Sequence, residues 1–449
     1  MEYSTWAAVD HQPARHYLWH AVTIFCTSSR VGVALTTNHT PSVPSFRSPH
    51  LKESTHHPLA MAPPSRKVLL LCGDYVEDYE AAVPLYALPA LGVAVDVVAP
   101  GKLPGSHCLT AVHEFLGHDL YTELPGHARL PVTASLADPS RYDALLVPGG
   151  RCVEPLSCDP TAVALVAAFV KTRKPVVLTC HSQLLLAAAG AMAGVTCTAF
   201  FSLRPVVEMA GGKWVDPNPF EKCVVDGHVL TAIGWPAHAQ IIGKLLARLG
   251  ARVDGGAGKA VLILCGDYVD DYEANVPFRL LSALGCRVDC ASPTKRKGDH
   301  CVTAIYDAPP SPAAAVTEER RGHNFGVTVD WADVVFAADE YDCVVVPGGR
   351  APELLVTHAS AVALVKEVAE KGKVVGSVDQ GHLLLAAAGV VKGKRCASGV
   401  PMKVVARVAG AEVVEDGGAV VDGKLVTAAS WLDLPEFLAH IIEQLAFAA

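Results

Sequence analysis

An internal repeat constrains this chain more than any other feature of its sequence. The segment KVLLLCG at 67–73 leads into DYVEDYEAAVP, and KAVLILCG at 259–266 leads into DYVDDYEANVP. A second matching pair follows, with VVLTCHSQLLLAAAG at 176–190 and VVGSVDQGHLLLAAAG at 374–389. Because both copies keep these segments in the same order, we expect two domains of one fold in a single chain.

The two copies differ where chemistry is most expected. Counting back from the shared LLLAAAG pairs Cys180 with Asp379 and His181 with Gln380. A cysteine next to a histidine at the end of a buried strand is a candidate nucleophile with its base. The second copy has neither group, so we expect chemistry in the first half and a partner role for the second.

Composition limits the class of protein. The chain has 449 residues, of which 51% are apolar and 18% charged, enough for two buried cores. No apolar run approaches the roughly 18 residues of a membrane span. A net charge of −8 disfavours nucleic acid as a partner. The 14 cysteines form no Cys-x-x-Cys pair, which favours free thiols in a reducing compartment.

Residues 1–62 stand apart from the repeat and are predicted to be disordered, being rich in Ser, Thr, His and Pro with few acids. One reading is an organelle transit peptide, which would place the protein in the plastid. The other, which we favour, is an upstream extension with Met61 as the working start. That reading gives a cytoplasmic protein, with the nucleus as a further location.

The rest of the chain divides into residues 66–252, a linker at 253–258, and residues 259–449. In each half, short Val/Leu-rich runs alternate with helical patterns. Continuous apolar runs between helices indicate a parallel sheet covered on both faces. We therefore predict two tandem flavodoxin-like or Rossmann-like three-layer α/β sandwiches with mostly parallel sheets.

Cys180 lies between an apolar strand pattern and a helix pattern. The start of a helix offers unpaired N–H groups and the positive end of the dipole, which favour a thiolate and can hold an oxyanion. The alternative is a buried structural cysteine. The only metal-like spacing, from His113 to His118, is one residue too long for two histidines on one helix face.

Four motifs stand out along the chain: GDYVEDYE, the Pro-Gly-Gly-Arg turns at 148–151 and 347–350, Cys180-His181 before a Leu/Ala-rich helix, and the TAIGW and TAASW strands. Together they resemble the DJ-1/PfpI superfamily, in particular its plant-type members with two tandem domains. They cover about residues 66–449. The resemblance implies a class I glutamine amidotransferase-like fold. A true amidotransferase is disfavoured because Gln240, not Glu, follows His238 by two residues.

The resemblance implies roles for particular residues. The family nucleophile falls on Cys180 and its neighbouring histidine on His181. The loop acid that hydrogen-bonds the cysteine is placed at Glu77. A further acid in family dimers comes from the partner's Pro-Gly-Gly-Arg turn. In a tandem chain this would bring Glu353 to Cys180 and Glu154 to Asp379.

The implied function is that of a stress-response protein acting on small reactive aldehydes. Related members are cofactor-independent glyoxalases that convert methylglyoxal to lactate, and neither metal nor nucleotide is expected. The alternative is a non-catalytic redox sensor or chaperone-like protein, and the family is also known under the name of intracellular cysteine peptidases. The halves would pack as a pseudo-dimer within the chain, and further homo-oligomers are expected.

The sequence departs from the family pattern around both corners. Leu178 and Ser182 stand where Ser and Gly are usual, and the bulk of Leu178 predicts a tilted Cys180 or a narrowed pocket. Phe200-Phe201 replaces the usual Tyr-Pro, which predicts a more apolar site. In the second half, Asp270 replaces the loop Glu, and Asp379 and Gln380 replace the Cys-His pair. We therefore expect low activity at Cys180 and a degenerate second site made of Asp379, Gln380, Asp270 and Glu154.

Overall fold

The computed structural model describes residues 66–115, 121–135, 138–251, 255–307, 318–336, 338–415 and 418–446. The predicted disordered extension, residues 1–62, lies outside these ranges. Within the described ranges, every helix is too short or too polar to span a bilayer.

The first half is built on a six-stranded sheet. Its strand order is β12-β13-β9-β8-β1-β3, and all neighbours are parallel except β12 and β13. The strands are β1 (Arg66–Leu71), β3 (Val93–Val98), β8 (Ala144–Val147), β9 (Val176–Thr179), β12 (Cys223–Asp226) and β13 (Val229–Ala232). The central strands β8 and β9 are buried along their whole length, as the continuous apolar runs predicted.

The second half repeats this sheet strand for strand. The order is β16-β14-β19-β20-β24-β23, again with one antiparallel pair at the β23 edge. The strands are β14 (Ala260–Leu264), β16 (Arg287–Ala291), β19 (Cys343–Val346), β20 (Val374–Val378), β23 (Ala419–Asp422) and β24 (Leu425–Ala428). The predicted α/β fold with mostly parallel sheets is therefore confirmed in both halves.

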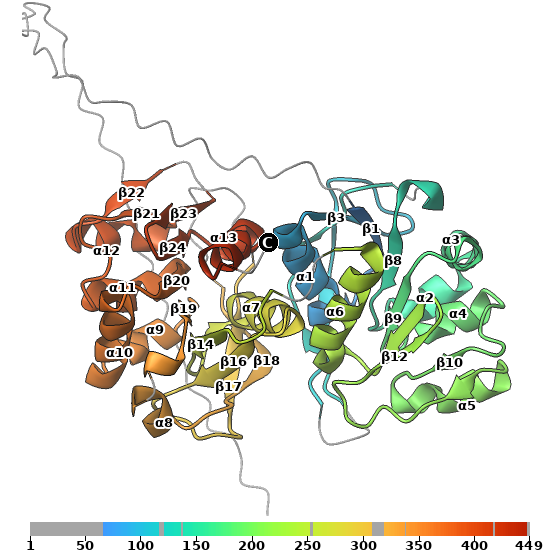
Figure 1. The fold of residues 1–449 in the computed structure, drawn as a ribbon. Helices are drawn as coiled ribbons and strands as arrows, with labels where there is room; N and C mark the ends of the chain where they lie inside the picture. Colours follow the sequence, from blue (N-terminus) through green and yellow to red (C-terminus); the bar gives the residue numbers. More distant parts are fainter. Residues whose placement is uncertain are drawn as a thin grey trace, which may run out of the picture. The chain divides into compact units, whose positions relative to one another are not determined.

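Helices cover both faces of each sheet (Figure 1). In the first half, α1 (Asp78–Ala87) and α6 (His238–Leu249) lie on the face toward the second half. The helices on the opposite face are α2 (Val153–Cys158), α3 (Pro160–Thr172) and α4 (Gln183–Ala188). In the second half, α7 (Asp271–Ala283) and α13 (Leu434–Gln444) face inward, whereas α9 (Ala351–Leu355), α10 (Ala359–Glu370) and α11 (His382–Ala387) face outward.

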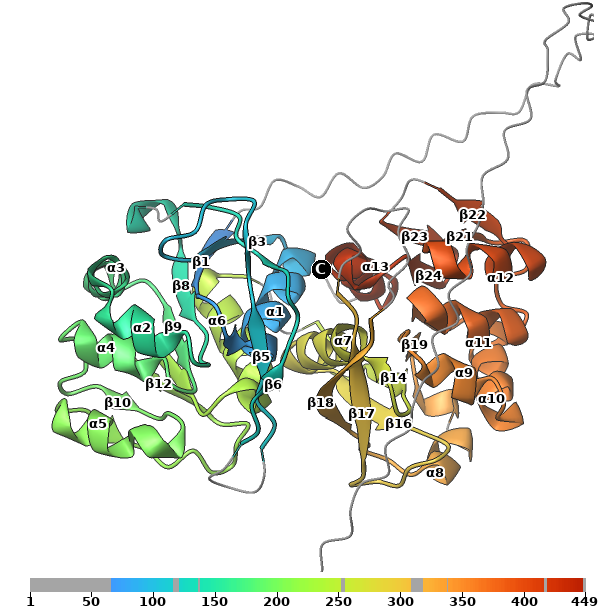
Figure 2. The ribbon, with the colours of Figure 1, turned by 180° about the vertical axis from the view of Figure 1, so that it is seen from behind.

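The two halves meet through these inner helices. Helix α7 packs against both α1 and α6, and α13 packs against the 3-10 turn η1 (Leu88–Leu91). One continuous cluster of buried apolar side chains includes members from both halves. Viewed from behind, two small sheets also flank this boundary (Figure 2). They are β2 (Val76–Glu77) with β5 (Thr110–Val112) and β6 (Leu124–Pro125), and β15 (Val269–Asp270) with β17 (His300–Ile305) and β18 (Arg320–Gly326).

Candidate active site

Cys180 stands at a sharp corner between β9 and α4. Its φ of +57° is in the left-handed region, which side chains other than glycine seldom adopt. Its N–H donates to the Ala232 carbonyl at 3.1 Å, and its carbonyl accepts from the Phe200 N–H at 2.9 Å. The corner is therefore fixed on both sides and has the geometry of a nucleophile elbow.

His181 is oriented to take the thiol proton. Its Nδ1 lies 3.1 Å from Cys180 Sγ, and its Nε2 lies 3.2 Å from Ser202 Oγ. Burial lowers the pKa of His181, and the charge of Arg151 lowers it further. A neutral ring protonated at Nε2 satisfies both contacts, since it donates to Ser202 and accepts from the thiol.

The site does not favour the Cys180 thiolate that the sequence predicted. Burial raises the pKa of Cys180 well above its usual value, and the carboxyl groups of Glu80 and Glu77 raise it further. The backbone N–H groups of Gly150 and His181 lower the pKa, but their effect is smaller. The resting group is the protonated thiol, so nucleophilic attack depends on His181 as a base.

The acid that shares the corner with Cys180 is Glu80. A Cβ added to Gly149 would lie 3.1 Å from both Cys180 Sγ and Glu80 Oε2, so both groups lie beside the space left by this glycine. Glu80 Oε2 accepts hydrogen bonds from the Gly149 N–H at 2.7 Å and from the Thr179 hydroxyl. Burial, with a contribution from Glu77, raises the pKa of Glu80 to about 8. Glu80 is therefore a carboxylic acid at neutral pH and can donate a proton.

Glu77, contrary to the prediction, is used elsewhere. Its Oε2 accepts the Glu80 N–H at 2.7 Å and caps α1, while its Oε1 lies 2.9 Å from Nε2 of His323 in the second half. Glu77 lines the same cavity as Cys180. Among the hydrogen bonds of the described residues, however, none joins the two, because capping turns the Glu77 carboxyl along the start of the helix.

The Pro-Gly-Gly-Arg turns also act differently from the prediction. Glu353 binds Arg350 of its own turn at 2.7 Å and is half exposed, so it does not reach Cys180. Glu154 likewise binds Arg151 at 3.0 Å, on the side of His181 rather than of Asp379. Each turn follows a central strand of its own sheet, and the ion pair with the arginine of the same turn holds each acid within its own half.

The cavity at the corner is small and partly open, and most of the residues that line it carry aromatic rings. Its volume is about 10 Å³, close to the room for one water molecule. Phe200 stacks on His181 with ring centroids 5.1 Å apart. Leu178, predicted to narrow the site, is instead fully buried in the core and does not line the cavity. The lining residues are Glu77, Glu80, His113, Phe115, Tyr121, Gly150, Cys180, His181, Phe200 and Trp235.

His113, one end of the rejected metal motif, lies in the wall of this cavity. Burial lowers its pKa to about 4, so the ring is neutral. Its Nδ1 has no hydrogen-bond partner among the described residues, and His118 lies outside them.

The second half keeps the corner without its chemistry. Asp379 follows β20 with a φ of +43° and so repeats the left-handed corner of Cys180. Burial raises the pKa of Asp379 to about 6. Asp270 caps α7 by accepting the Tyr272 and Glu273 N–H groups at 3.0 Å, and burial raises its pKa to about 7. The corner therefore gathers carboxyl groups in place of a thiol and its base.

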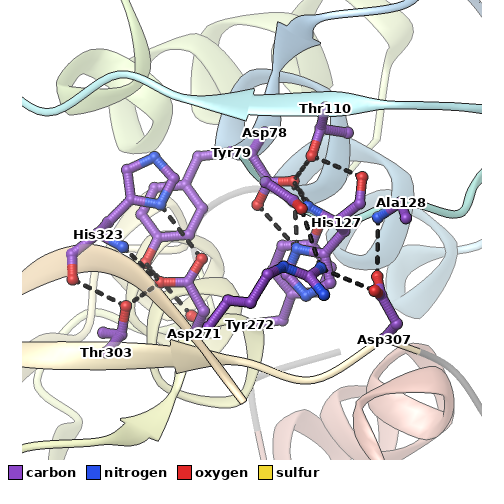
Figure 3. Close-up of polar contacts among 12 residues, drawn as sticks. Asp78, Tyr79, Thr110, His127, Ala128, Asp271, Tyr272, Thr303, Asp307 and His323 are labelled. Carbon is purple, nitrogen blue, oxygen red and sulfur yellow. Dashed lines mark hydrogen bonds and ion pairs between the residues drawn. The ribbon is translucent and has the colours of Figure 1, made fainter. Parts of the chain in front are cut away.

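A buried polar network joins the halves (Figure 3). On one side, Asp78 lies 3.1 Å from Nδ1 of His127 and accepts the Thr110 hydroxyl. Tyr272, from the second half, donates its hydroxyl to Asp78 at 2.9 Å and stacks on His127 with centroids 3.8 Å apart. His127 thereby fixes its loop to this network.

The other side of the network repeats the pattern (Figure 3). Asp271 lies 3.2 Å from Nδ1 of His323 and accepts the Thr303 hydroxyl. Tyr79 donates to Asp271 at 2.6 Å and stacks on His323 with centroids 3.5 Å apart. Ligand atoms of Asp78, His127 and Asp271 are close enough to hold a metal. Those atoms already make hydrogen bonds within the protein, so we assign the cluster to the interface.

Comparison with known proteins identifies the family. The model of the DJ-1/PfpI family matches residues 66–248 and again residues 259–444. The chain belongs to the DJ-1/PfpI family. The tandem arrangement is shared by DJ-1 protein homolog E of Arabidopsis thaliana, which is 50% identical over 83% of this chain and 95% of its own. Protein DJ-1 homolog D of the same plant is 43% identical over 84% of this chain and 97% of its own.

More distant DJ-1/PfpI relatives match a single half. A deglycase of Thermococcus kodakarensis is 33% identical over 36% of this chain and 86% of its own length. Among solved structures, DJ-1beta of Drosophila melanogaster aligns with 42% of this chain and 91% of its own, at 23% identity and a TM-score of 0.34.

The sequence interpretation missed Glu80 within the motif of this DJ-1/PfpI chain. The signal was present in the repeat, because Glu80 matches Glu273 unchanged whereas Glu77 becomes Asp270. Glu273 also repeats the contact of Glu80, accepting the Gly348 N–H at 2.7 Å. Identity between the two copies disfavoured Glu77, but it is shared by Asp78 and so did not single out Glu80.

Proposed function

We propose that this DJ-1/PfpI protein converts small 2-oxo aldehydes, such as methylglyoxal, into 2-hydroxy acids at Cys180 without a cofactor. The observation that carries the proposal is the 3.1 Å contact between Cys180 Sγ and a neutral His181, next to the buried acid Glu80. The archaeal relatives named deglycases support substrates with reactive carbonyl groups.

The first step is addition to the aldehyde. Cys180 Sγ bonds to the aldehyde carbon while its proton passes to Nδ1 of His181. The carbonyl π bond breaks, and its oxygen takes the proton from His181 to give a hemithioacetal. The histidine is neutral again at the end of this step and can act a second time.

The second step moves hydrogen between the two carbons. His181 removes the proton from the former aldehyde carbon, and the electron pair forms a carbon–carbon double bond while the ketone oxygen takes the proton of Glu80. His181 then protonates the second carbon. The hydroxyl on the carbon bonded to Sγ returns a proton to Glu80 and becomes a carbonyl, which leaves a thioester of the 2-hydroxy acid. Water cleaves the carbon–sulfur bond, Sγ regains a proton, and lactic acid leaves.

The cavity supports small substrates and slow turnover. It has room for about one water molecule, so a bound aldehyde must displace aromatic walls such as Phe200 and Tyr121. A protonated thiol with a raised pKa also adds to the barrier of the first step. Both features fit the low activity expected from the sequence.

The test is lactate formation from methylglyoxal by the purified full chain. Cys180→Ala should remove the activity, and Asp379→Ala, at the matching corner of the second half, should leave it unchanged. Loss of activity in Asp379→Ala with retention in Cys180→Ala would reverse the assignment, and a parent protein without activity would refute it.

A peroxide sensor at Cys180 is the second candidate from the sequence, but its burial disfavours it. The thiolate is the form that peroxide oxidises, and burial raises the pKa of Cys180. After peroxide treatment, mass spectrometry should find the exposed Cys158 oxidised before Cys180. The reverse order would favour a sensor over an enzyme.

A further inference from the structure

His323 is a buried residue of the second half that reaches the active-site half. It lies on β18 and is fully buried. Its Nδ1 is 3.2 Å from Asp271 Oδ2, and its Nε2 is 2.9 Å from Glu77 Oε1. Burial alone would lower the pKa of His323, but Asp271 and Glu77 raise it well above its usual value. With a carboxyl group at each ring nitrogen, both nitrogens donate.

Glu77 connects this histidine to the catalytic corner. One carboxyl oxygen binds His323, and the other accepts the backbone N–H of Glu80 at 2.7 Å. The same helical turn carries the Glu80 side chain to Gly149 and Thr179 beside Cys180. The position of His323 therefore fixes the first turn of α1, and that turn fixes the acid at the thiol.

His127, which matches His323 in the repeat, makes no such connection from the first half to the second. His127 binds Asp78 through Nδ1, as His323 binds Asp271, but no hydrogen bond among the described residues joins His127 to Asp270. Asp270 is one methylene shorter than Glu77, and its Oδ1 accepts both capping N–H groups of α7. The bond between a histidine of one half and the capping acid of the other therefore occurs only in the half that retains the cysteine.

We propose that His323 is a positioning residue for the Cys180 site, supplied by the second half through Glu77. The effect of His323 on turnover rests on the proposed function, but its effect on the reactivity of Cys180 toward alkylation does not. The second half would then complete the active site of the first, and the site would be incomplete in an isolated first half.

Two substitutions separate the two bonds of His323. An Asn side chain places its amide near the position of Nδ1, and a Gln side chain reaches the position of Nε2. His323→Asn should keep the donor to Asp271 and lose the donor to Glu77, whereas His323→Gln should do the reverse. His127→Asn is the matched control, since it keeps the donor to Asp78 at the Nδ1 position, and no hydrogen bond among the described residues joins His127 to Glu77 or Glu80.

The main readout is alkylation of Cys180 by iodoacetamide in the native full chain, followed by mass spectrometry. His323→Asn should raise this rate about fivefold or more, because the wall formed by Glu77 and Glu80 is no longer fixed. His323→Gln and His127→Asn should stay near the parent rate. Cys197, also buried, should be unchanged in every sample, which excludes general unfolding.

Turnover provides the second readout. His323→Asn should lower kcat for methylglyoxal about tenfold or more with a smaller change in KM, and His323→Gln should restore it. If the parent has no turnover, the proposed function fails while the alkylation test still decides the role of His323. Equal alkylation in the Asn and Gln variants of His323, or in the Asn variants of His323 and His127, would overturn the proposal.

A variant at the other end of the bond covers a failure of His323→Asn to fold. Glu77→Asp keeps a capping carboxyl, as Asp270 does in the second half, but is too short to reach His323. It should raise Cys180 alkylation as His323→Asn does, and Asp270→Glu should not. An unchanged rate in Glu77→Asp would contradict the proposed connection.

Discussion

Tyr79 of the first half donates its hydroxyl to Asp271 of the second half across a distance of 2.6 Å. Tyr272 returns the same bond to Asp78 at 2.9 Å, so the boundary between the halves carries a reciprocal pair. Both tyrosines are almost fully buried. A polar contact of this kind stabilises only the arrangement in which the two halves face each other correctly.

Tyr79→Phe should therefore destabilise the protein. It leaves a buried acceptor on Asp271 with one donor fewer, which should cost about 1–3 kcal/mol of unfolding free energy. Urea denaturation measures the loss as a lower midpoint. Tyr75→Phe, at a half-exposed position, is the control and should leave the midpoint unchanged. Equal midpoints for the two variants would mean that the bond across the boundary does not stabilise the fold.

Gly149→Ala should disable the corner. A Cβ at this position would lie 2.4 Å from the Cβ of Cys180, closer than packed atoms approach. The cysteine must move away from His181, so turnover should fall by about 100-fold or more. Gly326→Ala, where nothing lies within 4 Å of the added carbon, should behave as the parent. Retained turnover in Gly149→Ala would show that the 3.1 Å contact is not required.

His181→Ala should reduce kcat by about 10² to 10⁴-fold, because the protonated thiol then has no base. Ser202→Ala should have a much smaller effect, since Ser202 only holds the proton on Nε2. Stopped assays of lactate formation distinguish the two variants. A similar loss in both would indicate that ring orientation, rather than proton transfer, is the main contribution of His181.

Glu80→Gln should change the pH dependence of both activity and stability. Burial raises the pKa of Glu80 from 4.5 to about 8, so the folded protein holds this proton more tightly than the unfolded chain. The contribution of Glu80 to the stability of the parent is therefore complete below pH 4.5 and is lost as the pH rises toward 8. Glu80→Gln carries no such proton, so its stability relative to the parent should increase across this window.

Activity should respond in the matching way. The proposed mechanism needs protonated Glu80, so parent turnover should decline as the pH rises through about 8. Glu80→Gln should have low turnover without this decline. Urea midpoints and initial rates at a series of pH values test both statements, and a parent profile that is flat through pH 8 would contradict the assigned role of Glu80.

Much of the architecture could be read from the sequence because it is encoded locally. The apolar runs of β1, β8 and β9, with helical patterns between them, are sufficient to indicate a parallel sheet covered on both faces. The site was predicted only in part. Cys180 and His181 are neighbours in the chain, so their proximity needs no long-range information, and they lie together as predicted.

The acids could not be assigned in the same way. Glu77, Asp78 and Glu80 lie within four residues at the start of a helix, where each successive side chain points in a different direction. Their spacing indicates that one of these acids caps the helix and that another lies about one turn later. Only the packing of α1 between β9 and the second half sends Glu80 to the thiol, Asp78 to His127 and Glu77 to His323.

Short stretches of the chain already encode the repeat, the α/β fold of each half, the corner at Cys180 and the loss of its counterpart at Asp379. The contact of His323, rather than of Glu353, with the first half follows only from the packing of the two halves. The physical reason is that hydrophobic periodicity and turn chemistry act over a few residues, whereas a contact between residues 77 and 323 depends on how two finished domains pack.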